Sequence, residues 1–292
     1  MAGGKYYPYA IWAALFALFL RLDPSVHEFS KSYLQRFDAL QGLRLAKEMR
    51  GSSIKVTSGD PGAVAEALTP KITILSFDPF IAHVADFLSP SELTHLKKLS
   101  APYLSRSTVL YANGSKMESN ERTSSTAYLM MDDNVLTSIR DRASKFQGFL
   151  PRHTVDIQVT SYQQGQQYTP HWDWFLEPDR TDQRLSTFFA IIEADCTDCG
   201  TQFPKLKVDW SKKDPRWCEL VDCSKEVLTT RNIPGSAFFW ENIDRTGKGR
   251  DEMLHAGLPA INGTKVGLNV WTTVELSRYQ KHEGEGMLLQ PQ

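Results

Sequence analysis

The sequence carries almost no net charge and no concentrated patch of basic residues. Its 33 lysines and arginines are balanced by 34 aspartates and glutamates, so the formal net charge at pH 7 is -1. No run of lysine and arginine with interleaved aromatic residues occurs, and the sequence contains no internal repeat. Without a positive field, the surface has nothing to hold a polyanion. Nucleic acid is therefore not expected as a partner.

A second catalytic domain is not expected either. The chain has 292 residues, 41% of them hydrophobic and 23% charged, which leaves room for one globular domain of roughly 200 residues plus appendages. We predict this domain over residues 71–278. A stem helix and a linker should precede it over residues 23–70, because apolar residues first recur at threes and fours and a stretch rich in Gly, Ser and Thr then follows. Residues 279–292 should form a mobile tail.

The N-terminal stretch lacks a clear cleavage site of small residues. Residues 9–20 are an uncharged run closed by Arg21, and such a short run fits the core of a signal peptide, because a full bilayer span takes about 20 residues. Since no cleavage site follows Arg21, we predict an uncleaved signal anchor over residues 1–22. The alternative is a buried core helix. An anchor of this kind predicts a single-pass protein of the endoplasmic reticulum membrane with a luminal domain.

Two helices and a later series of short strands are expected within the domain. Ser89 supplies an N-cap, Pro90 a first-turn proline and Glu92 a capping-box carboxylate. A second helix should begin at Asp133. The expected strands, rich in β-branched and aromatic residues, cover residues 154–162, 185–193, 226–229, 236–240 and 265–273. This pattern predicts a mainly β fold with flanking helices and a jelly-roll core.

The strongest functional signal lies in residues 162–175, which read YQQGQQYTPHWDWF. In extended chain, residues i and i+2 point to the same side, so His171 and Asp173 converge on one point. Two imidazoles and one carboxylate on one face are typical of non-haem Fe(II) oxygenases, and a second histidine is therefore required. His255 is the best candidate, because Lys265 follows it in a run of strand-forming residues, where a lysine needs an anionic partner.

With these residues in place, the sequence resembles the prolyl 4-hydroxylase family of Fe(II)/2-oxoglutarate dioxygenases over residues 71–273. The matched pieces are SYQQGQQYTPHWD, CGTQFP at 199–204, PGSAFFW at 234–240 and the stretch 255–271, in the family's order and spacing. The resemblance implies a double-stranded β-helix that hydroxylates a C–H bond. One alternative is a small-molecule oxygenase of the same class in a biosynthetic pathway. Another is a non-catalytic binding protein on the same barrel, which would have lost a ligand or the lysine.

The resemblance also implies which residues bind the cofactors. It makes His171, Asp173 and His255 the iron ligands and Lys265 the anchor for the distal carboxylate of 2-oxoglutarate. The cofactors and cosubstrates that it implies are Fe(2+), 2-oxoglutarate, dioxygen and L-ascorbate. The substrate that it implies is either a peptide or a small molecule.

Four further residues receive roles from the resemblance alone. Tyr162 and Thr187 are similar to residues that assist 2-oxoglutarate binding in the family. Arg122, in the sequence ERTSS, matches an arginine near the substrate, and Trp271 is similar to a residue near the mouth of the active site.

The four cysteines form two close pairs, at 196 and 199 and at 218 and 223. This spacing resembles a zinc ribbon, but a luminal domain lies in an oxidising compartment, which favours disulfides. Four cysteines allow three connectivities, and the sequence does not choose among them. Asn113 and Asn262 begin glycosylation sequons, although the second lies three residues from Lys265.

The residues before Tyr162 suggest that the substrate is not a collagen-like repeat. Family members that act on proline-rich peptides often carry a glutamate seven residues before this tyrosine, where the sequence has Val155 with Asp156 beside it. Strand alternation puts these two side chains on opposite faces, so we do not expect Asp156 to replace the glutamate. By the same alternation, Trp172 and Trp174 are expected to face away from the metal ligands.

Overall fold

The computed structural model describes residues 68, 70–110, 115–148, 155–177 and 180–277. The predicted anchor and tail, and the predicted stem and linker except for residues 68 and 70, lie outside these ranges. Within them, no helix is both long and apolar enough to cross a membrane.

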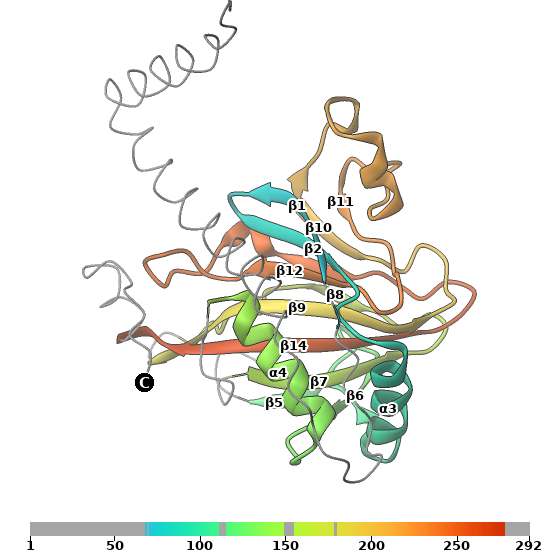
Figure 1. Ribbon diagram of the computed structural model, residues 1–292, viewed down its shortest axis with the longest axis vertical. Helices are drawn as coiled ribbons and strands as arrows, with labels where there is room; N and C mark the ends of the chain where they lie inside the picture. Colours follow the sequence, from blue (N-terminus) through green and yellow to red (C-terminus); the bar gives the residue numbers. More distant parts are fainter. Residues whose placement is uncertain (1–67, 69, 111–114, 149–154, 178–179, 278–292) are drawn as a thin grey trace, which may run out of the picture. The chain divides into compact units, whose positions relative to one another are not determined.

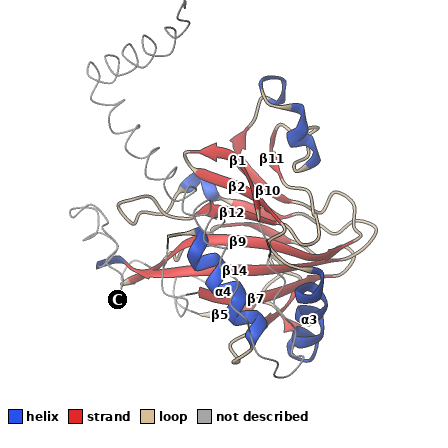
Figure 2. Cartoon of the chain, in the orientation of Figure 1, coloured by secondary structure: helices blue, strands red, loops and turns tan. Residues whose placement is uncertain are grey.

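The described part of the chain is mainly β. The strands are β1 Lys71–Phe77, β2 Phe80–Ala85, β3 Ser105–Arg106, β4 Thr108–Leu110, β5 Lys116–Glu118, β6 Ser125–Tyr128, β7 Val155–Tyr162, β8 Tyr168–His171, β9 Asp182–Ala194, β10 Thr201–Lys207, β11 Val227–Thr229, β12 Ala237–Glu241, β13 His255–Gly257 and β14 Lys265–Glu275. The helices are α3 Pro90–Ser100 and α4 Asn134–Phe146, with short 3-10 turns η2 Ala101–Tyr103, η4 Trp210–Lys212, η5 Pro215–Glu219 and η6 Asp251–Met253. Figure 2 shows how the strands dominate the domain.

The strands form two sheets that pack on each other, plus the small hairpin β4-β5. The large sheet has the order β1-β2-β12-β9-β14-β7-β6-β3, and the small sheet has the order β11-β10-β13-β8. Each pairing between the named strands is antiparallel. Phe203 of the small sheet meets Trp240 of the large sheet edge to face, with ring centroids 5.3 Å apart. Two facing antiparallel sheets with such crossovers form the predicted jelly roll.

Both predicted helices are present and cover the outer face of the large sheet (Figure 1). Ser89 caps α3, and the side chain of Glu92 accepts a hydrogen bond from the Ser89 backbone, which completes the capping box. Asp133 caps α4 by accepting hydrogen bonds from two backbone amides of the first turn. Leu96 of α3 and Ile139 of α4 are fully buried against the sheet.

The central strand β9 shows why the large sheet is buried on both faces. Phe188 and Ala190 lie in the cluster under the helices, whereas Phe189 and Ile191 lie in the cluster between the two sheets. Adjacent residues thus serve opposite faces, as a strand requires. The strand therefore reads as a continuous apolar run rather than an alternating one.

The predicted strands are all present, with ends shifted by at most a few residues. The structure adds strands that the sequence pattern did not indicate, including β1 and β2 at one edge of the large sheet and the short β8 and β13 of the small sheet. The cysteines are paired locally, Cys196 with Cys199 and Cys218 with Cys223. The expectation of disulfides is therefore confirmed, and the structure resolves the connectivity.

Candidate active site

The two histidines of the site lie opposite each other on neighbouring strands. His171 is the last residue of β8 and His255 the first of β13, and the two are register partners. Asp173 follows His171 by two residues, with its carboxylate 4.0 Å from Nε2 of His171 and 3.7 Å from Nε2 of His255. One ligand atom from each of the three residues lies within 4.8 Å of the other two.

Backbone carbonyl groups set the tautomer of both histidines. Nδ1 of His171 lies 2.8 Å from the carbonyl oxygen of Thr169, and Nδ1 of His255 lies 2.8 Å from that of Met253. A carbonyl oxygen only accepts, so each Nδ1 must carry the proton. Nε2 of each ring then faces Asp173 and is the ring atom available to a metal, which is the arrangement of metal-bound histidines.

The charge states of the site suit a cation. Burial lowers the pKa of His171 well below its usual value, so this imidazole is neutral. Burial alone would raise the pKa of Asp173, but His255, His171 and Arg184 lower it overall, so the carboxylate is ionised. Two imidazoles and one ionised carboxylate, all aimed at one point, fit a divalent transition metal with open coordination positions.

A buried hydrogen-bond chain orients the carboxylate. The Thr187 hydroxyl donates to Oδ2 of Asp173 at 2.7 Å, and the Asn242 amide donates to the Thr187 hydroxyl at 2.9 Å. Thr187 and Asn242 are fully buried. The chain leaves Oδ1 of Asp173 on the side of His171.

Lys265 is buried completely at the start of β14. Its ammonium donates a hydrogen bond to the Cys199 carbonyl oxygen at 2.5 Å and lies 4.8 Å from the ring centre of Tyr162, its register partner on β7. Among the described residues no carboxylate pairs with it. Burial lowers its pKa from 10.5 to about 7. The lysine therefore lacks the anionic partner that a buried cation requires.

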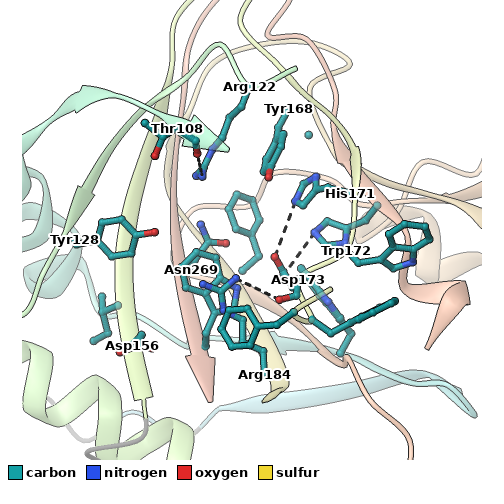
Figure 3. Close-up of a pocket in the computed structure, with 18 of the residues that line it drawn as sticks. Thr108, Arg122, Tyr128, Asp156, Tyr168, His171, Trp172, Asp173, Arg184 and Asn269 are labelled. Atoms are coloured by element: carbon teal, nitrogen blue, oxygen red, sulfur yellow. Dashed lines mark hydrogen bonds and ion pairs between the residues drawn. The ribbon is translucent and has the colours of Figure 1, made fainter. Parts of the chain in front are cut away.

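A cavity of about 690 Å³ opens in front of His171, Asp173 and His255 (Figure 3). Arg122 lines it, donates to Oε1 of Gln158 at 2.9 Å and lies over the ring of Tyr168. The Tyr168 ring in turn stacks on His171 with centroids 3.4 Å apart. The structure thus brings Arg122 to the site, although its sequence context is a polar loop.

Trp271 also lines the cavity, as expected. It stacks on Arg184, whose guanidinium carbon is 4.0 Å from the ring centre, and Arg184 donates to the backbone oxygen of Asp173. Sequence reasoning missed Arg184, because an arginine in the charged stretch around it reads as a solvated residue.

Two expected side-chain positions differ in the structure, those of Trp172 and Trp174. Thr187 donates a hydrogen bond to Asp173 and lies opposite Trp271 in the sheet register, and its expected role in 2-oxoglutarate binding stays a prediction. Trp172 and Trp174 line the cavity instead of facing away, because β8 ends at His171 and strand alternation ends with it.

Thr201 is a second residue that sequence reasoning missed. It lines the cavity and pairs with Gly257 across the small sheet. A side-chain carbon on Gly257 would come within 3.3 Å of the Tyr162 hydroxyl. Thr201 and Tyr162 therefore flank one end of the cavity. The only sequence signal was the position of Thr201 directly after the motif glycine, Gly200.

Asp156, six residues before Tyr162, lines the cavity, which corrects the expectation about the substrate. Val155 is 2% exposed in the cluster under the helices, whereas Asp156 is exposed, lines the cavity and pairs with Trp271. Counting seven residues back from Tyr162 selected the wrong face of β7. The argument against proline-rich substrates loses its basis.

A jelly roll with two histidines and one aspartate converging beside an open cavity defines the class of non-haem iron oxygenases. No protein-family model matches the sequence. The chain is 32% identical over 206 residues to prolyl 4-hydroxylase 5 of Arabidopsis thaliana, covering 68% of this chain and 70% of that protein. It is 30% identical over 209 residues to probable prolyl 4-hydroxylase 10 of the same plant, covering 70% and 72%. A viral collagen prolyl hydroxylase from Paramecium Bursaria Chlorella virus-1, solved with 2-oxoglutarate, matches with a TM-score of 0.48 and 23% identity over 66% of this chain and 96% of that one.

The chain belongs to the prolyl 4-hydroxylase family. It is an Fe(II)- and 2-oxoglutarate-dependent dioxygenase, as the sequence motifs predicted, and the family uses Fe(2+), 2-oxoglutarate, dioxygen and ascorbate.

Proposed function

We propose that His171, Asp173 and His255 hold the iron and that Lys265 binds the distal carboxylate of 2-oxoglutarate. The tautomers of the two histidines and the ionised aspartate support the first assignment. The fully buried ammonium, which has a carbonyl partner but no carboxylate among the residues that the structure describes, supports the second, because a bound carboxylate would supply its counter-charge.

Other residues of the cavity complete the cosubstrate and substrate sites. Tyr162 and Thr201 line the cavity, Tyr162 is the register partner of Lys265, and both residues have hydroxyl groups that can hydrogen-bond the same carboxylate. Arg122 and Trp271 line the cavity and would position the substrate. When bound, the iron would activate dioxygen, the oxidant that couples decarboxylation of 2-oxoglutarate to hydroxylation of the substrate. The protein side chains hold the reactants and exclude water.

The substrate that we infer is a proline residue within an extended peptide. The rim of the cavity supports this inference, because Tyr128, Met130 and Leu176 line it and are 49%, 83% and 49% exposed. Exposed apolar side chains beside a cavity mark a binding surface larger than the cavity itself. Figure 3 shows Tyr128 and Asp156 across the cavity from His171 and Asp173, so the surface extends away from the metal ligands.

Hydroxylation assays test the substrate. The purified protein would be incubated with iron, 2-oxoglutarate, ascorbate and either proline-rich peptides, collagen-like peptides or free proline. We expect 4-hydroxyproline in at least one peptide class, together with an equal amount of succinate. Succinate formation that depends on free proline or another small molecule, with no peptide modified, would contradict the inference and favour the small-molecule alternative.

We also propose that the protein is anchored in the endoplasmic reticulum membrane with its catalytic domain in the lumen. The uncharged run at residues 9–20 and the two disulfides support this location. Protease protection of the full chain in microsomes tests it. A domain that is digested without detergent, or cysteines that are free in protein isolated from cells, would contradict it.

A further inference from the structure

The contact between Lys265 and Cys199 joins the cosubstrate site to a disulfide. Within the described part of the chain, the ammonium of Lys265 makes one hydrogen bond, to the Cys199 carbonyl oxygen at 2.5 Å. The position of this ammonium therefore depends on where that one carbonyl points. Cys199 is 2% exposed, packs beside Tyr162 and is bonded to Cys196.

Two groups constrain the turn that carries the Cys199 carbonyl, a disulfide and a side-chain amide. The Cys196–Cys199 disulfide ties its ends together around Asp198, whose φ of 50° lies in the left-handed region that non-glycine residues rarely adopt. The Asn232 side-chain amide donates to the same Cys199 carbonyl at 2.9 Å and lies 3.0 Å from the Cys199 sulfur. Disulfide and amide thus act on one peptide group.

The same turn also holds the chain that leads into Lys265. The Asp195 carboxylate accepts a hydrogen bond from the Thr264 backbone amide at 2.6 Å, directly before the lysine. The Thr197 amide donates to the Ile261 carbonyl oxygen at 2.8 Å. Alternate residues of the turn therefore bind the segment that delivers the lysine, and the Cys199 carbonyl binds the lysine itself.

The packing around the turn leaves this peptide little freedom. A side-chain carbon on Gly200 would lie 2.0 Å from the Thr230 carbonyl oxygen, so the backbone here passes against its neighbour without space. The Gly200 carbonyl accepts a hydrogen bond from the Leu258 amide. The direction of the Cys199 carbonyl is therefore set by the turn as a whole.

We propose that the Cys196–Cys199 disulfide and Asn232 are positioning groups for the 2-oxoglutarate site, which hold the Cys199 carbonyl so that it fixes the Lys265 ammonium toward the incoming carboxylate. The proposal rests on the proposed role of Lys265. It predicts that opening this disulfide weakens 2-oxoglutarate binding without weakening the metal site. His171 and His255 lie on other strands, β8 and β13, Asp173 follows β8, and the tautomers of the two histidines depend on other carbonyl groups.

The chain provides a matched control in its second disulfide. Cys218 and Cys223 are separated by five residues and Cys196 and Cys199 by three, so opening either loop should change the entropy of the unfolded chain by a similar amount. The Cys218–Cys223 pair lies in the segment between β10 and β11, and neither residue lines the cavity. Comparing the two double serine variants thus separates a local effect on the site from a general loss of stability.

Calorimetric titration of the full chain loaded with Mn²⁺ would measure 2-oxoglutarate binding without turnover. We expect Cys196→Ser/Cys199→Ser to raise the dissociation constant about tenfold, the lower end of what loss of a supporting residue does to a bound ion. The dissociation constant for Mn²⁺ should stay within about twofold of wild type. In Cys218→Ser/Cys223→Ser both constants should remain at wild-type values. Equal 2-oxoglutarate affinity in the two double variants would overturn the proposal.

Two further variants keep the result interpretable. If Cys196→Ser/Cys199→Ser does not fold by circular dichroism, Asn232→Ala decides, because it releases the same carbonyl with the disulfide intact. It should weaken 2-oxoglutarate binding severalfold, and unchanged binding would overturn the proposal. Lys265→Ala reports on the proposed function itself. If its affinity for 2-oxoglutarate equals that of wild type, the proposed role of the lysine is wrong. If Lys265→Ala binds 2-oxoglutarate more weakly while the Cys196→Ser/Cys199→Ser and Asn232→Ala variants bind it as wild type does, only the positioning role is refuted.

Discussion

Replacing Lys265 by methionine should stabilise the cosubstrate-free protein while abolishing 2-oxoglutarate binding. The side chain is fully buried beside the Tyr162 and Phe189 rings, and its ammonium has a backbone carbonyl as partner but no carboxylate among the described residues. Methionine has a similar length and fills the same apolar surroundings without a charge. With the role proposed for it, the lysine would serve cosubstrate binding while lowering the stability of the cosubstrate-free protein.

The pKa of Lys265 gives the size and the pH dependence of the effect. Burial lowers this pKa from 10.5 to about 7, and at 1.36 kcal/mol per pH unit this span corresponds to about 5 kcal/mol. The unfolded lysine is protonated below pH 10.5, so between pH 7 and 10.5 unfolding takes up a proton and stability rises with pH. The destabilisation is largest below pH 7, about 4 kcal/mol at pH 7 and about 2 kcal/mol at pH 9. Losing the hydrogen bond to Cys199 offsets about 1 kcal/mol of the gain.

Urea unfolding of the metal-free protein, followed by tryptophan fluorescence, measures this difference. Lys265→Met should exceed wild type in free energy of unfolding by about 3 kcal/mol at pH 7 and by about 1 kcal/mol at pH 9. Lys97→Met is the control, since Lys97 forms an exposed ion pair with Glu193 and its loss should change stability by less than about 1 kcal/mol at either pH. A Lys265→Met protein no more stable than wild type at pH 7, or a gain that does not shrink at pH 9, would refute the reasoning.

Three further substitutions test the site. His171→Ala should abolish stoichiometric iron binding and substrate-coupled succinate formation while circular dichroism stays native, and full iron content in this variant would show the ligand assignment to be wrong. Thr187→Val removes the hydroxyl that donates to Asp173 and should lower metal affinity about 10- to 100-fold, measured by Mn²⁺ titration; an unchanged Mn²⁺ affinity would mean that the aspartate needs no support. Lys265→Arg should restore 2-oxoglutarate binding only in part relative to Lys265→Ala, because the planar guanidinium differs in shape from an ammonium, and full recovery would mean that the site does not distinguish the two cations.

The sequence by itself determined the class of fold and identified the two histidines and the aspartate that converge in the structure. Capping residues form hydrogen bonds with the backbone close to them in sequence, so Ser89 and Asp133 correctly predicted where both helices begin. The two-residue spacing of His171 and Asp173 is likewise a local property, and the motif around His255 supplied the second imidazole. Local chemistry of this kind can be read from neighbouring residues alone.

Tertiary structure alone decided which more distant residues reach the site. Thr187 reaches Asp173 because the register of β9 with β14 places it opposite Trp271, which also lines the cavity. Asp156 rather than Val155 faces the cavity because the pairing of β7 with β14 sets the orientation of the whole strand, and a one-residue shift reverses it.

The contact between Lys265 and Cys199 shows the same limit most clearly. The two residues are 66 positions apart in sequence. Every residue has a backbone carbonyl, so the residue type at position 199 does not indicate that its carbonyl binds a lysine. The cysteine spacing suggested a disulfide, but only the folded turn aims the carbonyl beside it at the buried ammonium. Pairing between strands that are distant in sequence depends on how both sheets pack together. A local sequence pattern therefore cannot predict it.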